Sequence, residues 1–270
     1  MKITVVVENF AEKPDLLGEY GLSVHIQDGN TQVLMDTGQG EALIPNMASL
    51  GIRPGEIDHL VLSHGHFDHT GAVQKFLLRS PNIPVWAHPE FEMGHSRLRD
   101  GNVRFIGCHF NREAFDFRPV KGLTQITENI WAVEVPVEKR DPAFISSTPH
   151  LVVPSTSGTE PDLFPDDISL VVKGEKGLSV VLGCAHAGAV NILEEVARHF
   201  GTREFYTVTG GMHLGAQADE YLEKVTAELV SRFNVARWRP CHCSGIRAAF
   251  YLAGKAKDVS WAGAGTVHTV

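Results

Sequence analysis

The densest run of chemically reactive side chains lies between residues 63 and 71, and it limits what this chain can fold into. The apolar, β-branched run 57–62 before it predicts a buried strand, and 72–78 after it predicts a helix. Side chains alternate along an extended chain, so the first two histidines point the same way and the turn brings the rest round to them. Four side chains able to bind metal therefore converge: His64, His66, Asp68 and His69.

This group of side chains suits a pair of metal ions. Neutral imidazole binds zinc, iron and related divalent ions, and the carboxylate supplies negative charge that holds a second ion nearby. One tetrahedral site would not use so many donors in so short a loop. The run His-x-His-x-Asp-His at 64–69 resembles the hallmark of the metallo-β-lactamase superfamily. That resemblance implies an α/β (α+β) fold, a four-layer αββα sandwich of the metallo-β-lactamase type.

Length and composition set further limits. With 270 residues and 43% hydrophobic content the chain can build one large core, so we expect a single domain over 1–270. The formal charge of −8 argues against a general nucleic-acid surface. No apolar run is long enough for a membrane span, and the first residues do not form a signal peptide, so we expect a cytoplasmic protein. The four cysteines do not have the pattern of a disulfide framework.

The first fifty residues predict an opening strand, a hairpin and a helix. Strands are expected at 3–7, 22–26 and 32–35, the last two joined by the turn Asp28-Gly29-Asn30. Apolar residues at helical spacing predict a helix over 41–50. A carboxylate in a tight turn commonly accepts backbone N–H groups, so we expect Asp36 to support the site rather than bind metal.

Two segments in the middle of the chain lack any clean period. In the insert 89–120 five arginines alternate with five phenylalanines, which suggests a lid over the site. Its arginines could bind phosphate or carboxylate and its phenylalanines could stack on an aromatic ring; the alternative is a surface insertion with solvated charges and a satellite core. The segment 136–167 predicts a long loop. Four histidines in this part of the chain have open roles: His88, His95, His109 and His150.

The second half of the chain repeats one scheme three times: an apolar strand, a turn carrying histidine, and a helix. Functional groups favour strand ends in α/β proteins, because a rigid sheet fixes where each turn points. The superfamily resemblance implies that a last strand end supplies a metal-binding histidine, and His242 matches it within Cys-His-Cys-Ser-Gly. The strands are expected at 178–182, 205–208 and 236–239, ahead of His186, His213 and His242 respectively.

The resemblance also implies a carboxylate that bridges the two ions, and here the chain departs from the pattern. The expected Gly-Asp turn is replaced by Gly183-Cys184-Ala185-His186, so Cys184 or His186 takes that place. We favour His186, because imidazole reaches further from a turn and a cysteine that ends an apolar strand is commonly an inert buried thiol. One ion is then expected on His64, His66 and His186, and the other on Asp68, His69 and His242.

A narrower resemblance follows from Gly-Cys-x-His-Ala-Gly, Gly-Gly-x-His-Leu and Cys-His-Cys-Ser-Gly. These runs resemble a branch of class II metal-dependent hydrolases that includes the dihydropterin ribofuranosyl-aminobenzene phosphate synthase-like proteins. The implied activity is attack by metal-bound hydroxide on a small anionic, phosphorylated substrate, with Asp68 and His213 as catalytic residues. Zinc is the expected ion at both positions, and Mn, Fe or Ni also suit such ligands. The alternative is a synthase or transferase of pterin (methanopterin-type) biosynthesis that uses the same site.

Other functional classes fit the sequence less well. A redox protein with two irons usually needs a flavin domain, and a pure binding module would leave the histidines without use. A nuclease of this superfamily would need a basic arm, which is not evident. We therefore expect a small-molecule anionic substrate, with no membrane and no nucleic acid as partner, while a homo-oligomer stays open.

Overall fold

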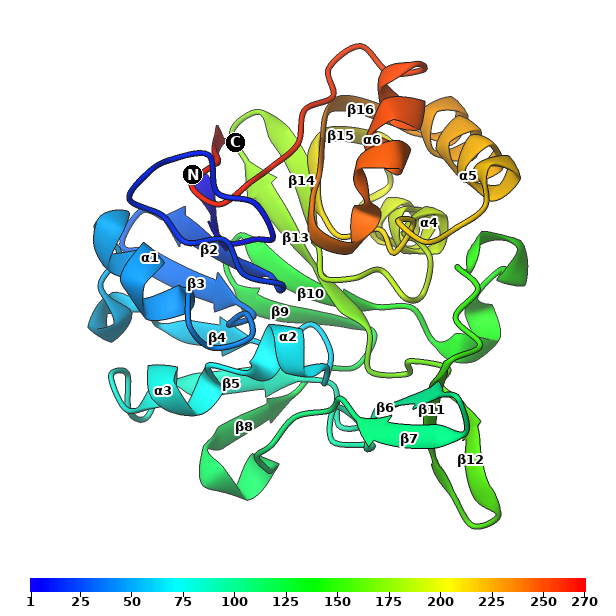
Figure 1. Ribbon diagram of the computed structural model, residues 1–270. Coiled ribbons are helices and arrows are strands. Elements are labelled where there is room, and N and C mark those ends of the chain that lie inside the picture. The colour runs from blue at the N-terminus through cyan, green and yellow to red at the C-terminus, as the bar shows by residue number, and fades with distance from the viewer.

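The N-terminal half of the chain forms a seven-stranded sheet in the computed structural model, which describes residues 1–270. The predicted strands and the hairpin at Asp28-Gly29-Asn30 are confirmed. The final strand of the chain returns to pair with the first one, so both ends of the sequence lie in the same sheet (Figure 1). In spatial order the strands are β17 (Val267–Thr269), β1 (Lys2–Val7), β2 (Ser23–Asp28), β3 (Thr31–Met35), β4 (His59–Val61), β5 (Pro84–Ala87) and β8 (Asp116–Pro119).

The C-terminal half forms a six-stranded sheet of mixed direction. Three of its strands are parallel to one another, as the repeated strand, turn and helix scheme predicts, because a helix must return the chain between parallel neighbours. Their register pairs Leu182 with Gly210 and Gly210 with Pro240, so the three strands end at the same edge. In spatial order the strands are β16 (Asn234–Pro240), β15 (Glu204–Gly210), β14 (Gly177–Leu182), β13 (Ile168–Gly174), β10 (Ile130–Glu134) and β9 (Leu123–Thr127).

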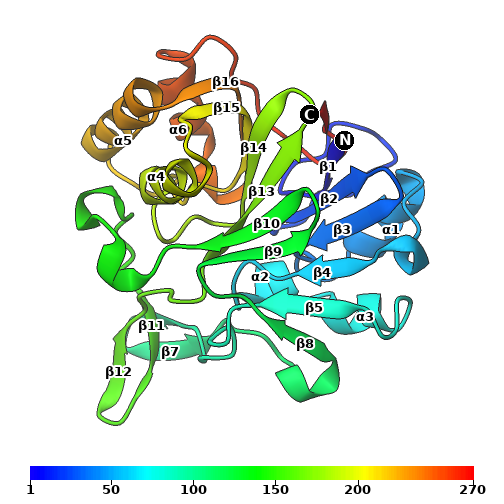
Figure 2. The same ribbon diagram turned by 180° about the vertical axis from the view of Figure 1, so that it is seen from behind.

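Helices cover the outer face of each sheet. On the N-terminal sheet lie α1 (Leu43–Ser49), α2 (Phe67–Thr70) and α3 (Val73–Leu77); on the C-terminal sheet lie α4 (Ala189–Phe200), α5 (Asp219–Arg232) and α6 (Ile246–Ala253). Figure 2 shows the two sheets face to face between these helix layers. The longest helix, α5, has 14 residues, and none of the helices is long and apolar enough to cross a membrane.

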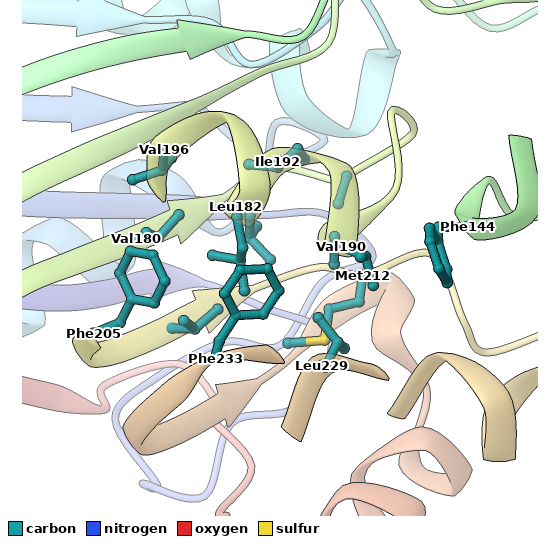
Figure 3. Close-up of a cluster of buried hydrophobic side chains, with 14 of the residues drawn as sticks. Phe144, Val180, Leu182, Val190, Ile192, Val196, Phe205, Met212, Leu229 and Phe233 are labelled. Carbon is teal, nitrogen blue, oxygen red and sulfur yellow. The ribbon is translucent and has the colours of Figure 1, made fainter. Parts of the chain in front are cut away.

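Three apolar cores hold the layers together. One cluster of 19 buried residues, including Ile3, Val24 and Val181, joins the inner faces of the two sheets. A second lies between the N-terminal sheet and its helices, and a third of 26 residues lies under α4, α5 and α6. Figure 3 shows side chains of this third cluster, among them Leu182 and Phe233, turned toward one another. Three cores between four layers confirm the four-layer αββα sandwich.

The prediction of a long loop at 136–167 is wrong. This segment contains β11 (Leu151–Ser155) and β12 (Gly158–Pro161), and β11 pairs with β6 (Ser96–Arg99) of the insert 89–120, which continues into β7 (Asn102–Phe105). The two irregular segments therefore build one small four-stranded sheet. Every residue of β7 and β12 is exposed, so neither strand has the alternation by which a half-buried strand is recognised.

The phenylalanines of the insert form the satellite core that was the alternative to a stacking surface. Phe91 is fully buried, and its ring lies 5.9 Å from that of Phe117 and 6.0 Å from that of Phe110. Phe115 packs against the same group. These four rings pack on one another, so the structure favours the satellite core of the two alternatives.

Candidate metal centre

The loop after β4 is held tightly in place by its backbone. Its glycine, Gly65, has no room for a side chain, since a Cβ there would lie 1.9 Å from the carbonyl oxygen of Phe91. The Gly65 N–H donates to Asp166 Oδ2 at 2.8 Å. Thr70 Oγ1 donates to the His66 carbonyl at 3.0 Å and fixes the start of α2. The side chains of the loop are therefore presented from a rigid turn.

Asp36 orients two of the loop histidines, as the sequence predicts. His69 Nδ1 donates to Asp36 Oδ2 at 2.7 Å, and the Ser63 N–H and hydroxyl donate to the same carboxylate at 2.7 and 2.6 Å. Ser63 Oγ in turn accepts from His64 Nδ1 at 2.9 Å. Each Nδ1 is thus a donor, which leaves Nε2 as a free lone pair facing the site.

Of the six imidazole nitrogens that lie buried without any hydrogen-bond partner, four gather at this centre. A buried polar atom without a partner is rare in proteins, and four in one place point to a ligand that the protein atoms do not supply. Burial lowers the pKa of His66 to about 3 and those of His64 and His186 well below the ordinary value, so these rings are neutral and their lone pairs can bind a cation. The orphan atoms are the Nε2 nitrogens of His64, His66, His186 and His242.

The six residues predicted to bind metal come together in two groups of three. Within each group the potential ligand atoms lie within 4.8 Å of one another. Asp68 Oδ2 is 3.4 Å from His242 Nε2 and 3.7 Å from His69 Nε2. The groups are His64, His66 and His186, and Asp68, His69 and His242, which are the two sets that the sequence predicts for two ions. Nitrogen and carboxylate donors in this number fit a pair of divalent ions.

Carboxylates supply the negative charge of this centre. Burial would raise the pKa of Asp68, but His69 and His242 lower it below its usual range, so the side chain stays ionised. Burial would likewise lower the pKa of His69, but Asp36 and Asp68 raise it to about 9. A site that stabilises a proton on a buried imidazole to this extent would stabilise a bound cation for the same reason.

Cys184 does not lie where the sequence predicts. We expected an inert thiol at the end of an apolar strand, but the left-handed backbone of Ala185 (φ 54°) turns the chain at this point. Cys184 Sγ is 3.2 Å from His69 Nε2 and belongs both to a group with His64 and His69 and to a group with His242 and Cys243. Cys184 therefore lies near donors of both groups of three, whereas His186 groups only with His64 and His66.

Glu8 and Asn9, which directly follow β1, both form hydrogen bonds with His242. Neither contact was predicted from the sequence. Glu8 Oε1 accepts from the His242 N–H at 2.7 Å, and Asn9 Oδ1 accepts from His242 Nδ1 at 3.0 Å. Asn9 therefore acts on His242 as Asp36 acts on His69, by leaving Nε2 free. The available signal in the sequence was the carboxylate Glu8 directly after an apolar run, and in the structure this side chain is fully buried.

Backbone strain gathers at this centre. Seven residues other than glycine have positive φ, and only Asn82 and Asp100 of these belong to exposed turns elsewhere. Left-handed backbone is costly for such residues and persists where the surrounding structure enforces it, commonly at functional sites. The five others surround the two donor groups: Asp36, Phe164, Ala185, His213 and His242. Among them, Phe164 stacks on the ring of His186 at 3.6 Å between centroids.

A cavity of about 400 Å³ opens onto the donors, a size that suits a small molecule. Asp68, Cys184 and His242 lie on one side of it, while Arg97 and His150 line it from the small sheet and the segment before it. His213, the third strand-end histidine, also lines it, with its ring 4.4 Å from that of His186.

Of the five arginines of the insert, only Arg97 lines the cavity. Arg99, Arg112 and Arg118 pair with carboxylates outside it. Arg104 lies directly opposite Arg97 across β6 and β7. Like charges that face one another across a strand pair repel. An anion bound beside Arg97 would reduce this repulsion, so the arrangement favours anion binding.

The other histidines of the middle segments lie outside the two groups of three. His95 lies between Asp162 (2.5 Å) and Asp166 (3.0 Å), and these carboxylates raise its pKa to about 10 despite its burial. His88 is 3.9 Å from Glu134, and His109 packs on Phe105. His95 therefore supports the Asp166 carboxylate that holds Gly65.

Comparisons with known proteins agree with this geometry. The family model of the metallo-beta-lactamase superfamily matches residues 17–197. The chain is 27% identical to the 7,8-dihydropterin-6-methyl-4-(beta-D-ribofuranosyl)-aminobenzene-5'-phosphate synthase of Methanocaldococcus jannaschii, over 92% of this chain and 89% of that protein. The crystal structure of Tm1679, a metal-dependent hydrolase of the beta-lactamase superfamily, is 28% identical, covers 100% of this chain and 99% of that one, and superposes with a TM-score of 0.85. The YhfI protein from Bacillus subtilis shares the fold at 11% identity and a TM-score of 0.61.

Proposed function

Because the chain belongs to the metallo-beta-lactamase superfamily, we propose that it is a metal-dependent hydrolase that acts on a small anionic, phosphorylated substrate. The observation that carries this proposal is the set of four buried, unpartnered imidazole nitrogens beside an ionised Asp68 at the wall of a cavity. A centre built in this way has ligands for cations on one side and space for a small molecule on the other.

Two divalent ions, zinc being the best fit to imidazole and carboxylate, would be held by the two groups of three donors. Such ions act as Lewis acids and lower the pKa of a bound water to about 7. The residues of the chain then have distinct tasks. Asp36, Ser63 and Asn9 keep the tautomers in which each Nε2 faces a cation.

Asp68 and His213 are the residues that would move protons. The ionised Asp68 carboxylate lines the cavity and can accept a proton from the attacking water. The His213 ring lies 4.4 Å from that of His186, is half-buried and lines the same cavity. Its position suits a donor of a proton to the leaving group, or a contact to the substrate.

Arg97 is the residue best suited to an anionic group. Its guanidinium forms no ion pair within the protein, and it lines the cavity near His150. A guanidinium fork matches phosphate with two parallel hydrogen bonds. The phosphate preference of the proposed hydrolase therefore rests on Arg97, with Arg104 opposite it as a second positive charge.

The hydrolase is tested first with phosphate esters and controlled metal content. Purified protein should release phosphate, lose this activity in a chelator and regain it when zinc is added. Arg97→Ala should then raise KM about tenfold or more, the loss expected of one charged hydrogen bond, and leave kcat within a factor of about three. Arg99→Ala, on the same strand but paired with Asp100, is the matched control and should behave as the native protein. Unchanged phosphoesterase activity in the double variant Arg97→Ala, Arg104→Ala would overturn the phosphate preference.

A synthase or transferase is the second candidate, and the similarity to the Methanocaldococcus jannaschii synthase over 92% of this chain favours it. The same centre would then bring a phosphorylated intermediate and an aromatic amine together. Product analysis with and without an added aromatic amine separates the two activities. A coupled product that forms only with the amine, at the expense of hydrolysis, would support the synthase.

A further inference from the structure

Two sulfur atoms lie among the donors of the metal centre. Cys184 follows β14 and Cys243 follows β16, and each belongs with His242 to one group of ligand atoms within 4.8 Å of one another. We propose that both side chains bind metal as thiolates, so that the centre holds two sulfur ligands in addition to its nitrogen and carboxylate ligands. This inference rests on the proposed function only in requiring that the centre binds metal.

The other two cysteines of the chain show what an inert thiol looks like in this fold. Cys241 belongs to the apolar core between the two sheets, and Cys108 belongs to the core under the N-terminal helices. Cys184 and Cys243 belong to none of the three apolar cores, and both line the cavity. A sulfur atom that lies outside the apolar cores and close to imidazole nitrogens has the surroundings of a metal ligand. A cysteine that only fills space in a core does not.

The backbone makes room for the sulfur of Cys243. A Cβ on Gly211 would lie 2.5 Å from Cys243 Sγ and 2.5 Å from the Gly183 carbonyl oxygen, so glycine at that position admits both atoms. The His213 N–H donates to the same Sγ at 3.3 Å, which stabilises negative charge on it. The left-handed His213 backbone, with φ 50°, aims this N–H at the sulfur. Gly211 and the backbone of His213, both in the turn after β15, thus determine the surroundings of Cys243 Sγ in the turn after β16.

Cys184 occupies the connecting position. Its Sγ is 3.2 Å from His69 Nε2, and His64 completes one group with it while His242 and Cys243 complete the other. A thiolate there would be shared between the two ions or would bind the one on the His242 side. Each thiol loses its proton to solvent when metal binds, so metal uptake should release protons.

The chemical consequence is selectivity among metals. Thiolate ligands favour zinc, iron and cobalt, whereas manganese and magnesium prefer carboxylate and water. The two sulfur ligands therefore narrow the range of ions that the imidazoles alone would accept. We expect zinc to be retained in competition with an excess of manganese.

X-ray absorption at the zinc edge of the zinc-loaded native protein tests the inference directly. Sulfur neighbours at about 2.3 Å from zinc are expected, beside nitrogen and oxygen neighbours at about 2.0 to 2.1 Å. This measurement needs no variant, so it does not depend on whether a variant folds. A first shell of nitrogen and oxygen alone would overturn the inference.

Variants assign the sulfurs individually. In the cobalt-substituted protein, the thiolate-to-cobalt charge-transfer band should fall by about half in Cys184→Ser and in Cys243→Ser and vanish in the double variant, because each thiolate contributes to it. Cys108→Ser is the matched control, since its hydroxyl can donate to the Phe110 carbonyl that the thiol now faces at 3.4 Å. An undiminished band in the double variant, with cobalt bound, would contradict the inference.

Hydrolysis is measured on the same samples, so that the two proposals fail separately. Zinc without sulfur neighbours in a protein that hydrolyses phosphate esters would overturn thiolate ligation alone. Zinc with sulfur neighbours in a protein that hydrolyses none of them would support thiolate ligation and overturn the hydrolase.

Discussion

The loop after β4 and the strand ends of the C-terminal half supply the side chains of the centre by different means. The loop places four donors within six positions, and none of these residues has a left-handed backbone. The strand ends of β14, β15 and β16 contribute one or two side chains each, and each of the three turns contains a strained residue. The first region is built by local sequence and the second by the register of three parallel strands.

The two regions also differ in how their histidines are oriented. His69 is held by Asp36, a fully buried carboxylate that accepts three hydrogen bonds. His242 is held by the amide oxygen of Asn9, which is only half-buried, and by its own backbone contact with Glu8. The side chain that orients His69 is therefore more deeply buried than the side chain that orients His242.

The largest effect is expected when the proton acceptor of the loop is removed. Asp68→Asn keeps the shape of the side chain but abolishes its charge, so kcat on a phosphate ester should fall on the order of 10² to 10⁴-fold. His213→Gln, the corresponding change at a strand end, should lower kcat less, because the His213 side chain belongs to none of the groups of possible metal ligands. Steady-state kinetics of both variants make the comparison. A larger loss in His213→Gln would reverse the assignment of roles.

The supports of the two histidines should differ in their effect on metal affinity. Asp36→Ala removes the acceptor for His69 and leaves buried Ser63 groups unpaired, so zinc affinity should fall about 10 to 100-fold and stability by about 1 to 3 kcal/mol. Asn9→Ala should weaken zinc binding by about tenfold or less, since water can reach the site that Asn9 leaves. Zinc titration with a competing indicator and urea unfolding measure the two quantities. Equal losses of zinc affinity in the two variants would mean that Asp36 and Asn9 support their histidines equally.

The smallest effect concerns a histidine outside both regions and separates general pH dependence from that of the centre. Burial, with Arg239 and Arg237 beside it, lowers the pKa of His268 to about 4. Between pH 6.5 and 4 the unfolded chain therefore binds a proton that the folded chain does not, and the free energy of unfolding falls as the pH falls, by about 1 to 2 kcal/mol. His268→Gln should show a smaller fall in the free energy of unfolding than the native protein in urea unfolding from pH 7 to 4, and the remaining fall belongs to the other buried histidines. The exposed control His109→Gln should show the full native fall. A fall in His268→Gln equal to that of the native protein would contradict the assignment.

Much of the fold and half of the centre could be predicted from the sequence. The loop could be predicted because its donors are contiguous, and the strand ends because apolar runs precede His186, His213 and His242. The choice between Cys184 and His186 could not, since it depends on the positive φ of Ala185, which no local pattern requires. Glu8 and Asn9 were missed because their partner lies 234 and 233 residues away.

The small four-stranded sheet was missed for a different reason. Its strands β7 and β12 have no buried face, and β6 and β11 meet through only a short register between residues 96–97 and 151–152. Alternation of apolar and polar residues arises from burial on one face, so strands without such a face carry no signal. The arginines of the insert were predicted to bind the substrate, but the amino-acid sequence could not distinguish Arg97 from the four others.

The contact between Glu8 and the His242 N–H affects the order in which the protein can mature during its synthesis. Glu8 leaves the ribosome 234 residues before its partner. Pairing of the strands β1 and β17 closes a still longer interval. Contacts so distant in the chain form late, because the entropy of closing the loop must be overcome first. A nascent chain can thus display the four donors of the loop well before the remaining side is in place, and metal acquired at that stage would bind an unfinished centre.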